Sequence, residues 1–573
     1  MTGVHAPSSK QVHVLVVLPS DKKRKRDAAV DGETAQDKKT INFDEFLENC
    51  PEKGSLPTEG DFLQLFEWNY QNCGEVKDIE AIGNIVGFTG SKFFVRKEVV
   101  CVLENLKIFK GIFDSGVFSK QFVLLGSPGT GKSCVLALLC FYVAVTTDQP
   151  VLWFRTVSGG RGERATRLFY KKKYYQWDGD DGEIYDCVYD EIKSRTKGFF
   201  WPCLDGFNQE SLSSSHSRRV VDFTLLATSG QFDVKSEGFS LVTLCLMPYW
   251  NRADLKLLAR AFEEPTEEDI ANRYFASGGC LREFLNPDAR EILQFALDKI
   301  TTPEHARSLL TARGCTSNEQ IDRLRMRGVA DVSNPTYYVK PSKWKAVVNS
   351  LFVLRHLTSL MEPNFFEELI GLARGMKDDR LEGVALEGYF HALVRRGQPI
   401  SIDYCTYDNV DRTIMNKKEW RTIMDKDKGS ISCAPANKVK WSGDSIEHCV
   451  RIMEEWAVDL SIADYWIPAD SLCETIDAVA KCKFPGEKDS RICFLQLTKA
   501  QKHKCDADIL WRLAQPFVGN AKVCYIALLS LPDKEIRSDF RLKPAVISNP
   551  EVLEHIPLYV ASYRLGSIES TSS

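Results

Sequence analysis

Short apolar runs alternate with amphipathic segments through the middle of the chain, between about residues 110 and 290. Short apolar runs of this kind are typical of buried strands. When helix-length segments separate them, they predict an α/β domain with a mainly parallel sheet. The expected strands are Phe122–Leu125, Val151–Phe154, Phe199–Leu204, Phe223–Ala227 and Leu241–Leu246.

The rest of the chain divides by the same patterns. Residues 41–110 place apolar side chains such as Phe62, Leu65 and Phe66 at helical spacing, and this segment is expected to be largely helical. Residues 291–375 are expected to form a helical lid or connector. From 376 to 573 the pattern is again mixed, with strands expected at Ile492–Leu497 and Val523–Leu528.

The composition indicates a globular protein. The chain has 573 residues, of which 44% are apolar and 27% are charged, enough for roughly two to four domains. A net charge of −4 argues against a protein that coats nucleic acid over its whole surface. The chain has 18 cysteines, none of them at C-x-x-C spacing. This pattern indicates reduced thiols buried in the core and a protein that works in a reducing compartment. No apolar run reaches the ~18 residues that a membrane span requires, so no membrane partner is expected.

The most specific motif is GSPGTGKS, which ends at Ser133. It follows the expected strand Phe122–Leu125 and precedes Cys134–Val145, a run apolar enough to be a buried helix. This strand–loop–helix order is the context in which a phosphate-binding loop occurs. Three glycines allow backbone N–H groups to turn toward the phosphates: Gly126, Gly129 and Gly131.

The last two residues of the motif carry its charge chemistry. Lys132 is expected to reach the β- and γ-phosphates, and the Ser133 hydroxyl to bind Mg²⁺. The helix N-terminus adds partial positive charge at the same place. Because the loop contacts only phosphates, the expected ligand is a nucleoside triphosphate, either ATP or GTP.

A nucleotide site of this kind also needs a carboxylate for the magnesium ion. Asp205 follows an apolar run and precedes a glycine, so it is the expected ligand; a plain Asp-Gly turn is the alternative. No glutamate follows Asp205, and the sequence therefore supports nucleotide binding more directly than turnover. Thr228 and Ser229 end another expected strand, where a hydroxyl either senses the γ-phosphate or caps the strand.

A cluster of basic residues follows the second expected strand. The spacing of its members predicts one face of a helix. A solvated basic face is favoured over a phosphate or nucleic-acid contact. The residues are Arg161, Arg164, Arg167 and Lys171.

Three segments resemble a known family. HVLVVLP (His13–Pro19) resembles the motif that closes the amino-terminal export region of Crinkler effectors of oomycetes, chytrids and some fungi. LVTLCLMPYWNRADLKLL (Leu241–Leu258) and RYFASGGCLREF (Arg273–Phe284) resemble elements of the NTPase of Crinklers and trypanosome retrotransposon hot-spot proteins. The resemblance implies a P-loop NTPase of the AAA/STAND-like type with a helical lid, in which Arg282 is the second sensor arginine.

The resemblance also implies a location. Crinkler effectors are secreted into a host cell and act in its nucleus, whereas here only a remnant of their export region, residues 1–20, precedes a linker at 21–40. That linker holds the basic run Lys22–Arg26, which is expected to engage the nuclear import machinery; a solvated charge run is the alternative. Most of the export region is therefore expected to be missing from this chain.

In many Crinklers a restriction-endonuclease-like domain follows the NTPase, and residues 376–573 are expected to form it. Such domains hold Mg²⁺ with carboxylates and a nearby lysine. Here Asp477 is the expected metal ligand, while Gln496 and Thr498 replace an acid and a lysine. This leaves an inactive, DNA-docking module as an open alternative. The expected catalytic set is Glu387, Asp477, Gln496, Lys499 and His503.

The sequence thus predicts a Crinkler-type effector, in which an ATP-binding and ATP-hydrolysing module is coupled to a nuclease-like module with Mg²⁺-dependent activity. One alternative is a catalytically dead, nucleotide-switched protein that binds host DNA or nuclear proteins such as chromatin factors. Another is an endogenous, transposon-associated NTPase.

Overall fold

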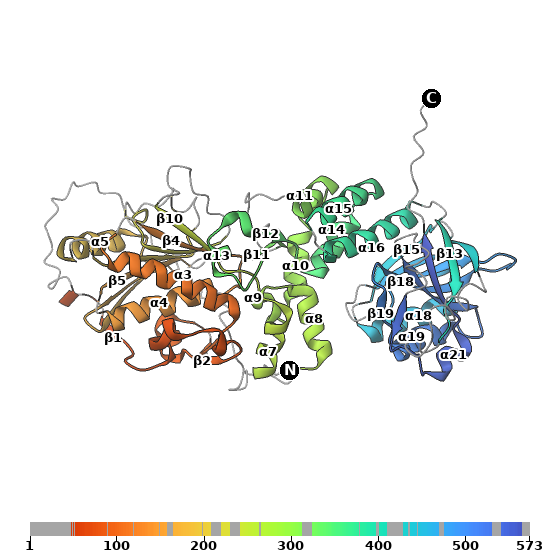
Figure 1. The fold of residues 1–573 in the computed structure, drawn as a ribbon, viewed down its shortest axis with the longest axis horizontal. Coiled ribbons are helices and arrows are strands. Elements are labelled where there is room, and N and C mark those ends of the chain that lie inside the picture. Colours follow the sequence, from red (N-terminus) through yellow and green to blue (C-terminus); the bar gives the residue numbers. More distant parts are fainter. Residues whose placement is uncertain are drawn as a thin grey trace, which may run out of the picture. The chain divides into compact units, whose positions relative to one another are not determined.

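The computed structural model describes residues 47–563 with internal gaps, and the chain divides into two compact units (Figure 1). Unit 1 comprises the residues up to Ala296 together with 312–350, and unit 2 comprises Leu297–Thr311 and the residues from Leu351 onward. The HVLVVLP motif (His13–Pro19), the basic run Lys22–Arg26 and Arg161 lie outside the described residues. The gaps are 49, 51, 89, 118–119, 148, 157–163, 197–198, 208–211, 213–218, 230–240, 263–264, 312–323, 377–378, 397–399, 410–427, 434–435, 444, 469–474 and 530–539.

Unit 1 is built on an eight-stranded mixed sheet with the order β1-β7-β6-β5-β8-β9-β4-β10. From β5 through β8, β9 and β4 to β10 neighbouring strands are parallel, whereas β6, β7 and β1 add an antiparallel edge. The α/β class is therefore confirmed, and each expected strand overlaps an observed one. The bounds are β1 (Glu52–Ser55), β4 (Gln121–Leu125), β5 (Val151–Thr156), β6 (Arg164–Tyr170), β7 (Lys173–Asp178), β8 (Trp201–Asp205), β9 (Leu225–Thr228) and β10 (Val242–Leu246).

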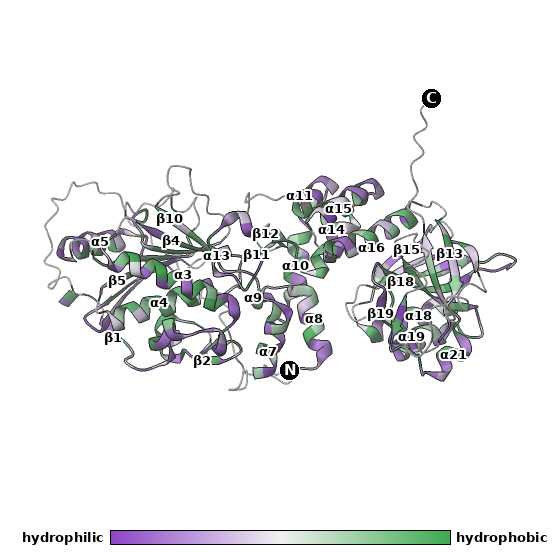
Figure 2. Ribbon diagram, in the orientation of Figure 1, coloured by the Kyte–Doolittle hydropathy of each residue, from purple (hydrophilic) through white to green (hydrophobic). Residues whose placement is uncertain are grey.

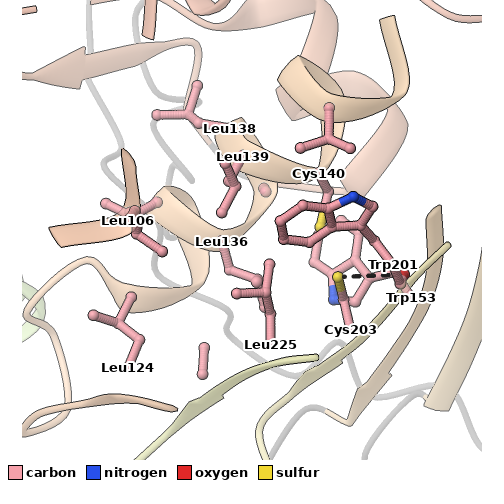
Figure 3. Close-up of a cluster of buried hydrophobic side chains, with 14 of the residues drawn as sticks. Leu106, Leu124, Leu136, Leu138, Leu139, Cys140, Trp153, Trp201, Cys203 and Leu225 are labelled. Atoms are coloured by element: carbon pink, nitrogen blue, oxygen red, sulfur yellow. Dashed lines mark hydrogen bonds between the residues drawn. The ribbon is translucent and has the colours of Figure 1, made fainter. Parts of the chain in front are cut away.

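Helix α4 (Lys132–Thr146) packs on this sheet and is apolar along almost its whole length (Figure 2). Its inner side chains, Leu136 and Cys140 among them, lie with Trp153 and Trp201 in the core of the unit (Figure 3). Its outer side is covered by the 3₁₀ helix η1 (Asp61–Glu67), where Phe62 and Phe66 contact aromatic rings of α4. Burial on both sides explains why α4 has no polar face.

The remaining elements of unit 1 are mostly short. They are η2 (Tyr70–Asn72), β2 (Val76–Asp78), α2 (Glu80–Val86), β3 (Lys92–Phe94), α3 (Lys97–Asp114), α5 (Glu183–Thr196), α7 (Arg252–Phe262), α8 (Glu267–Ser277), α9 (Leu281–Phe284), α10 (Ala289–Leu297, which ends at the unit boundary), β11 (Met326–Val329), α13 (Pro335–Tyr338), η4 (Pro341–Lys343) and β12 (Trp344–Val347).

One sequence expectation about unit 1 is wrong, and two segments that are expected to be mainly helical also contain short strands. Residues 41–110 include β1 and the antiparallel pair β2–β3 as well as helices, and 291–375 includes the antiparallel pair β11–β12. The basic segment after β5 is strand β6 and a turn. Because side chains alternate along a strand, Arg164 is exposed whereas Arg167 is buried over the Trp153 ring. The expected basic helical face therefore does not form.

Unit 2 has a second eight-stranded sheet, in the order β14-β13-β22-β20-β18-β17-β16-β15, and β14 also pairs with β17. The strands expected at Ile492–Leu497 and Val523–Leu528 lie within β18 and β20, which are parallel neighbours. The strands are β13 (Ile400–Thr406), β14 (Lys428–Cys433), β15 (Val439–Ser442), β16 (Tyr465–Pro468), β17 (Ala478–Lys483), β18 (Arg491–Thr498), β20 (Val523–Leu529) and β22 (Leu558–Tyr563), with the separate pair β19 (Lys502–Lys504) and β21 (Arg541–Lys543).

Helices precede and cover this sheet. They are α11 (Pro303–Thr311), α14 (Leu351–Ser359), α15 (Pro363–Met376), α16 (Asp379–Arg395), α18 (Ile446–Val458), η5 (Leu460–Ile462), α19 (Ala507–Ala514), η6 (Gln515–Phe517) and α21 (Pro550–His555). Among the helices that the structure describes, none combines the length and the apolarity needed to cross a bilayer.

Candidate functional site

The GSPGTGKS loop connects the end of β4 to the start of α4, as the motif requires. All three of its glycines, including Gly126 and Gly131, have positive φ. At Gly129 φ is 73° and a Cβ atom would lie 2.6 Å from the Cys280 sulfur, and at Gly126 a Cβ atom would lie 2.4 Å from the Met247 carbonyl oxygen. A side chain does not fit there without displacing the neighbouring segment, so this part of the loop requires glycine.

Lys132 and Ser133 occupy the first turn of α4. The Lys132 ammonium donates a hydrogen bond to the carbonyl oxygen of Ser127 within the same loop, at 2.8 Å. The Ser133 hydroxyl donates to Asp205 Oδ1, also at 2.8 Å. The loop thus presents a cation and a hydroxyl at a helix N-terminus, where partial positive charge favours anions.

Asp205 ends β8 and is buried. Its Oδ2 atom lies 3.3 Å from Arg155 Nε and has no hydrogen-bond partner among the described residues. Burial raises the pKa of Asp205, although Arg155 and the Ser133 hydrogen bond oppose the shift. A hydroxyl and a carboxylate, one of whose oxygens lacks a hydrogen bond, form a suitable pair of ligands for Mg²⁺. These residues therefore fit the ion that a nucleotide would bring.

Strand β9 lies between β4 and β8, so its end meets the loop and Asp205 at one edge of the sheet. In the strand register, Thr228 is opposite Leu125, and Ala227 is opposite Asp205. The Thr228 hydroxyl is buried without a hydrogen-bond partner among the described residues, and Ser229 follows it, half-buried. An unsatisfied buried hydroxyl is uncommon, and at this position a bound group could satisfy it.

The RYFASGGCLREF segment packs directly on the phosphate-binding loop. The Leu281 N–H donates to the Gly129 carbonyl oxygen at 3.3 Å, and the Cys280 thiol donates to the Pro128 carbonyl oxygen at 3.4 Å. Arg282 follows at once, with its backbone N 3.0 Å from the position of a Gly129 Cβ atom and its Nε buried without a hydrogen-bond partner among the described residues. The structure therefore places Arg282 beside the loop.

Arg96 holds the phosphate-binding loop and the segment after β10 together, a role that the sequence did not reveal. Its side chain is fully buried and donates to the carbonyl oxygens of Thr130, Pro248 and Tyr249, at 3.0, 2.7 and 3.2 Å. Its guanidinium also lies 4.6 Å from the centre of the Trp250 ring. The Met-Pro-Tyr-Trp segment is thus part of the loop's support. In the sequence Arg96 stands next to Lys97 and Glu98, and no local pattern distinguished it from these charged neighbours.

A second polar cluster lies in unit 2. Asp477 directly precedes β17, and its Oδ2 accepts hydrogen bonds from the Leu497 N–H and the Gln496 side-chain amide. The Gln496 nitrogen also lies 3.3 Å from His503 Nε2. Lys499 is not part of this cluster; its ammonium donates a hydrogen bond to Glu382 on α16, at 2.7 Å. The structure therefore brings together Asp477, Gln496 and His503 but not Lys499.

Glu387 joins this cluster through an arginine that the sequence did not single out either. Arg355 on α14 has its Nη2 3.5 Å from Glu387 Oε1 and 3.9 Å from Asp477 Oδ1. Burial opposes ionisation of Glu387, but Arg355 and His391 outweigh it and the pKa of Glu387 is lowered. Burial and then repulsion by Glu387 raise the pKa of Asp477 well above its usual value.

The unit 2 cluster does not fit a metal ion. In the described parts of the chain, no group of three His, Cys, Asp or Glu side chains is placed to hold one. An arginine lies between the two carboxylates, and the third expected ligand is an amide. A pocket adjoins the cluster and is lined by Arg355, Thr358, Ser359, Val384, Glu387, Gly388, His391, Arg395 and Ile467.

Fold and site together define a mixed α/β protein with a P-loop-like module. No protein-family model matches the chain, and no curated protein matches it. One solved structure that it resembles is a signal transduction ATPase with numerous domains (STAND) that carries a tetratricopeptide repeat sensor, from Pyrococcus horikoshii. The identity is 13% and the TM-score 0.17, over 51% of this chain and 48% of that chain. This chain therefore spans about half the length of that protein, and so low a similarity carries no argument.

Proposed function

We propose that unit 1 binds and hydrolyses a magnesium nucleoside triphosphate, ATP or GTP. The observation that carries this proposal is the 2.8 Å hydrogen bond between Ser133 and Asp205 at the N-terminus of α4. In an oxygen site of this kind, a hydroxyl and a carboxylate share one Mg²⁺ ion. The ion neutralises charge on the β- and γ-phosphates when it is bound.

Different residues of unit 1 bind the phosphates and the ion. The backbone of the loop and the Lys132 ammonium bind the phosphates, while Ser133 and Asp205 hold the ion. Thr228 and Ser229 contact the terminal phosphate, and Arg282 reaches it from the segment that packs on Gly129. No acidic side chain follows Asp205, where Gly206 stands, so turnover is slow and the nucleotide acts mainly as a switch. A switch of this kind works because the ligand binds one arrangement better than another.

Magnesium-dependent ATP hydrolysis by the purified full chain tests this proposal. We expect slow turnover in the wild-type protein and a loss of roughly 100-fold in Asp205→Asn, because the asparagine removes the charge that binds the ion. Arg282→Gln is the matched comparison, since it should lower kcat while leaving nucleotide affinity nearly unchanged. Equal turnover in all three proteins would show that the hydrolysis does not come from this site.

The finer proposal is a Crinkler-type effector whose nucleotide-dependent module controls a DNA-acting module in a host nucleus. It is supported by the ordered motifs described above, in particular by the contact of the RYFASGGCLREF segment with the loop. In this proposal Lys22–Arg26 recruits the import machinery, and host DNA or nuclear proteins are the partners of unit 2.

A second candidate is favoured by the contacts of Arg355. Here unit 2 is a nuclease-like module without nuclease activity, and the protein is a nucleotide-switched binder of host DNA or chromatin partners. Arg355 lies between the two carboxylates, and Gln496 replaces the third acid. We expect no nicking of supercoiled plasmid in Mg²⁺ or Mn²⁺. Nicking that disappears in Asp477→Ala would favour the active nuclease instead.

A further inference from the structure

The feature that carries an inference beyond nucleotide binding is the position of Arg355 in unit 2. Its guanidinium lies within 4 Å of a carboxylate oxygen on each of two different elements, Glu387 on α16 and Asp477 before β17. All three side chains are largely shielded from solvent, with exposed fractions of 17%, 16% and 10%. Arginine remains protonated in proteins, so this cation is permanent.

Three of the four oxygens of the two carboxylates already lie against nitrogen atoms of the protein. Oδ2 of Asp477 accepts two N–H groups, from Leu497 and Gln496, while its Oδ1 faces Arg355. Oε1 of Glu387 faces Arg355 and lies 3.6 Å from His391 Nε2. A divalent ion would need carboxylate oxygens at about 2.0–2.6 Å, in the space that the guanidinium fills. The two cations therefore exclude each other.

One polar atom of the Gln496 side chain has no hydrogen-bond partner among the described residues. This atom, Oε1, is buried, and the amide nitrogen of the same side chain bonds to Asp477. An amide oxygen is an acceptable ligand for a hard cation, though a weaker one than a carboxylate. With the guanidinium removed, two carboxylates would lie near each other without a cation, and the Gln496 amide that bonds to Asp477 would add a buried oxygen without a hydrogen bond from the described residues.

We propose that Arg355 is a built-in substitute for the divalent cation of a carboxylate metal site, and that its removal opens a site for Mg²⁺ or Mn²⁺ formed by Glu387, Asp477 and Gln496. The wild-type protein binds no divalent ion there. This inference deepens the second candidate function, because it explains why a nuclease-like cluster is inactive. It does not depend on nucleotide binding by unit 1.

The test uses Mn²⁺ as the probe, with no nucleotide present, and counts free Mn²⁺ by electron paramagnetic resonance. All proteins carry Asp205→Asn, so that unit 1 contributes no ion site. We expect Arg355→Met to bind one Mn²⁺ per chain roughly 100-fold more tightly than its parent, because two buried carboxylates lose their counter-ion. Mn²⁺ should also raise the melting temperature of this variant and not that of the parent.

Two controls keep the outcome decisive. Arg395→Met removes the other arginine that lines the pocket and should bind no ion, since Arg395 donates to the backbone carbonyls of Ser359 and Met361 instead. Arg355→Met combined with Glu387→Gln restores the charge balance and should fold without binding Mn²⁺.

If Arg355→Met is insoluble alone, Mn²⁺ in the growth medium should rescue it, and failure of that rescue overturns the proposal. Tight Mn²⁺ binding by the parent that is lost in Asp477→Asn would also overturn it.

Discussion

Replacing Lys132 by methionine is expected to weaken binding of Mg·ATP by about 10- to 100-fold, while leaving the fold intact. Methionine keeps most of the length of the side chain and removes the ammonium group. A hydrogen bond to a charged group contributes about 1.5–3 kcal/mol, and a tenfold change in affinity corresponds to about 1.4 kcal/mol. The ammonium donates to a carbonyl oxygen within its own loop, so the variant loses one local hydrogen bond.

Titration of a fluorescent ATP analogue in the presence of Mg²⁺ measures this affinity. Lys193→Met is the matched control, because Lys193 lies half-exposed on α5 of the same unit, with its ammonium 3.9 Å from Asp222. It should bind nucleotide like the wild-type protein. Unchanged affinity in the Lys132 variant would remove the loop from consideration as the nucleotide site.

The second large effect is expected from Gly206→Ala, which should destabilise unit 1 by about 3 kcal/mol. Gly206 has φ of 84°, and a Cβ atom there would lie 2.0 Å from the carbonyl oxygen of Thr156 on the neighbouring segment. The left-handed conformation costs a non-glycine residue about 1–2 kcal/mol, and overpacking adds about 1–3 kcal/mol. Because Gly206 directly follows Asp205, any backbone shift that relieves the clash also moves the expected magnesium ligand.

Thermal unfolding with and without Mg·ATP tests this prediction, since the transition that shifts with nucleotide identifies unit 1. Gly179→Ala provides the comparison: its φ is 77°, and nothing lies within 4 Å of its Cβ position. The backbone penalty alone, about 1–2 kcal/mol, should apply there. If both variants lose the same stability, the close approach of Gly206 to Thr156 does not exist in solution.

The phosphate-binding loop could be found from the sequence because its elements are contiguous. The strand, the glycines, Lys132 and the apolar helix follow one another, and each has a local pattern. Asp205 could be proposed because an acid after an apolar run marks the end of a strand, and the structure places it 2.8 Å from Ser133. Whether these residues bind nucleotide stays a prediction until it is measured.

Arg96 and Arg355 could not be found in the same way. Each acts through partners that are distant in sequence: Arg96 contacts Pro248 and Tyr249, and Arg355 contacts Asp477. No periodicity records such pairings, which arise only when separate segments pack.

The prediction of a helix after β5 was wrong for a different reason. Charged residues at positions 164, 167 and 171 match one face of a helix, but this segment pairs with β5 and β7 as a strand, and the pairing overrides the spacing.

The path of the chain sets the order in which the nucleotide site can be completed during synthesis. Strand β11 belongs to unit 1 but follows residues 297–311, which belong to unit 2. From β11, the Arg327 N–H donates to the Ser127 hydroxyl of the loop, and the Arg327 carbonyl accepts from the Tyr249 N–H. On the ribosome the β4–loop–α4 segment therefore emerges long before its last support, and the loop can reach its final form only after part of the other unit has been translated.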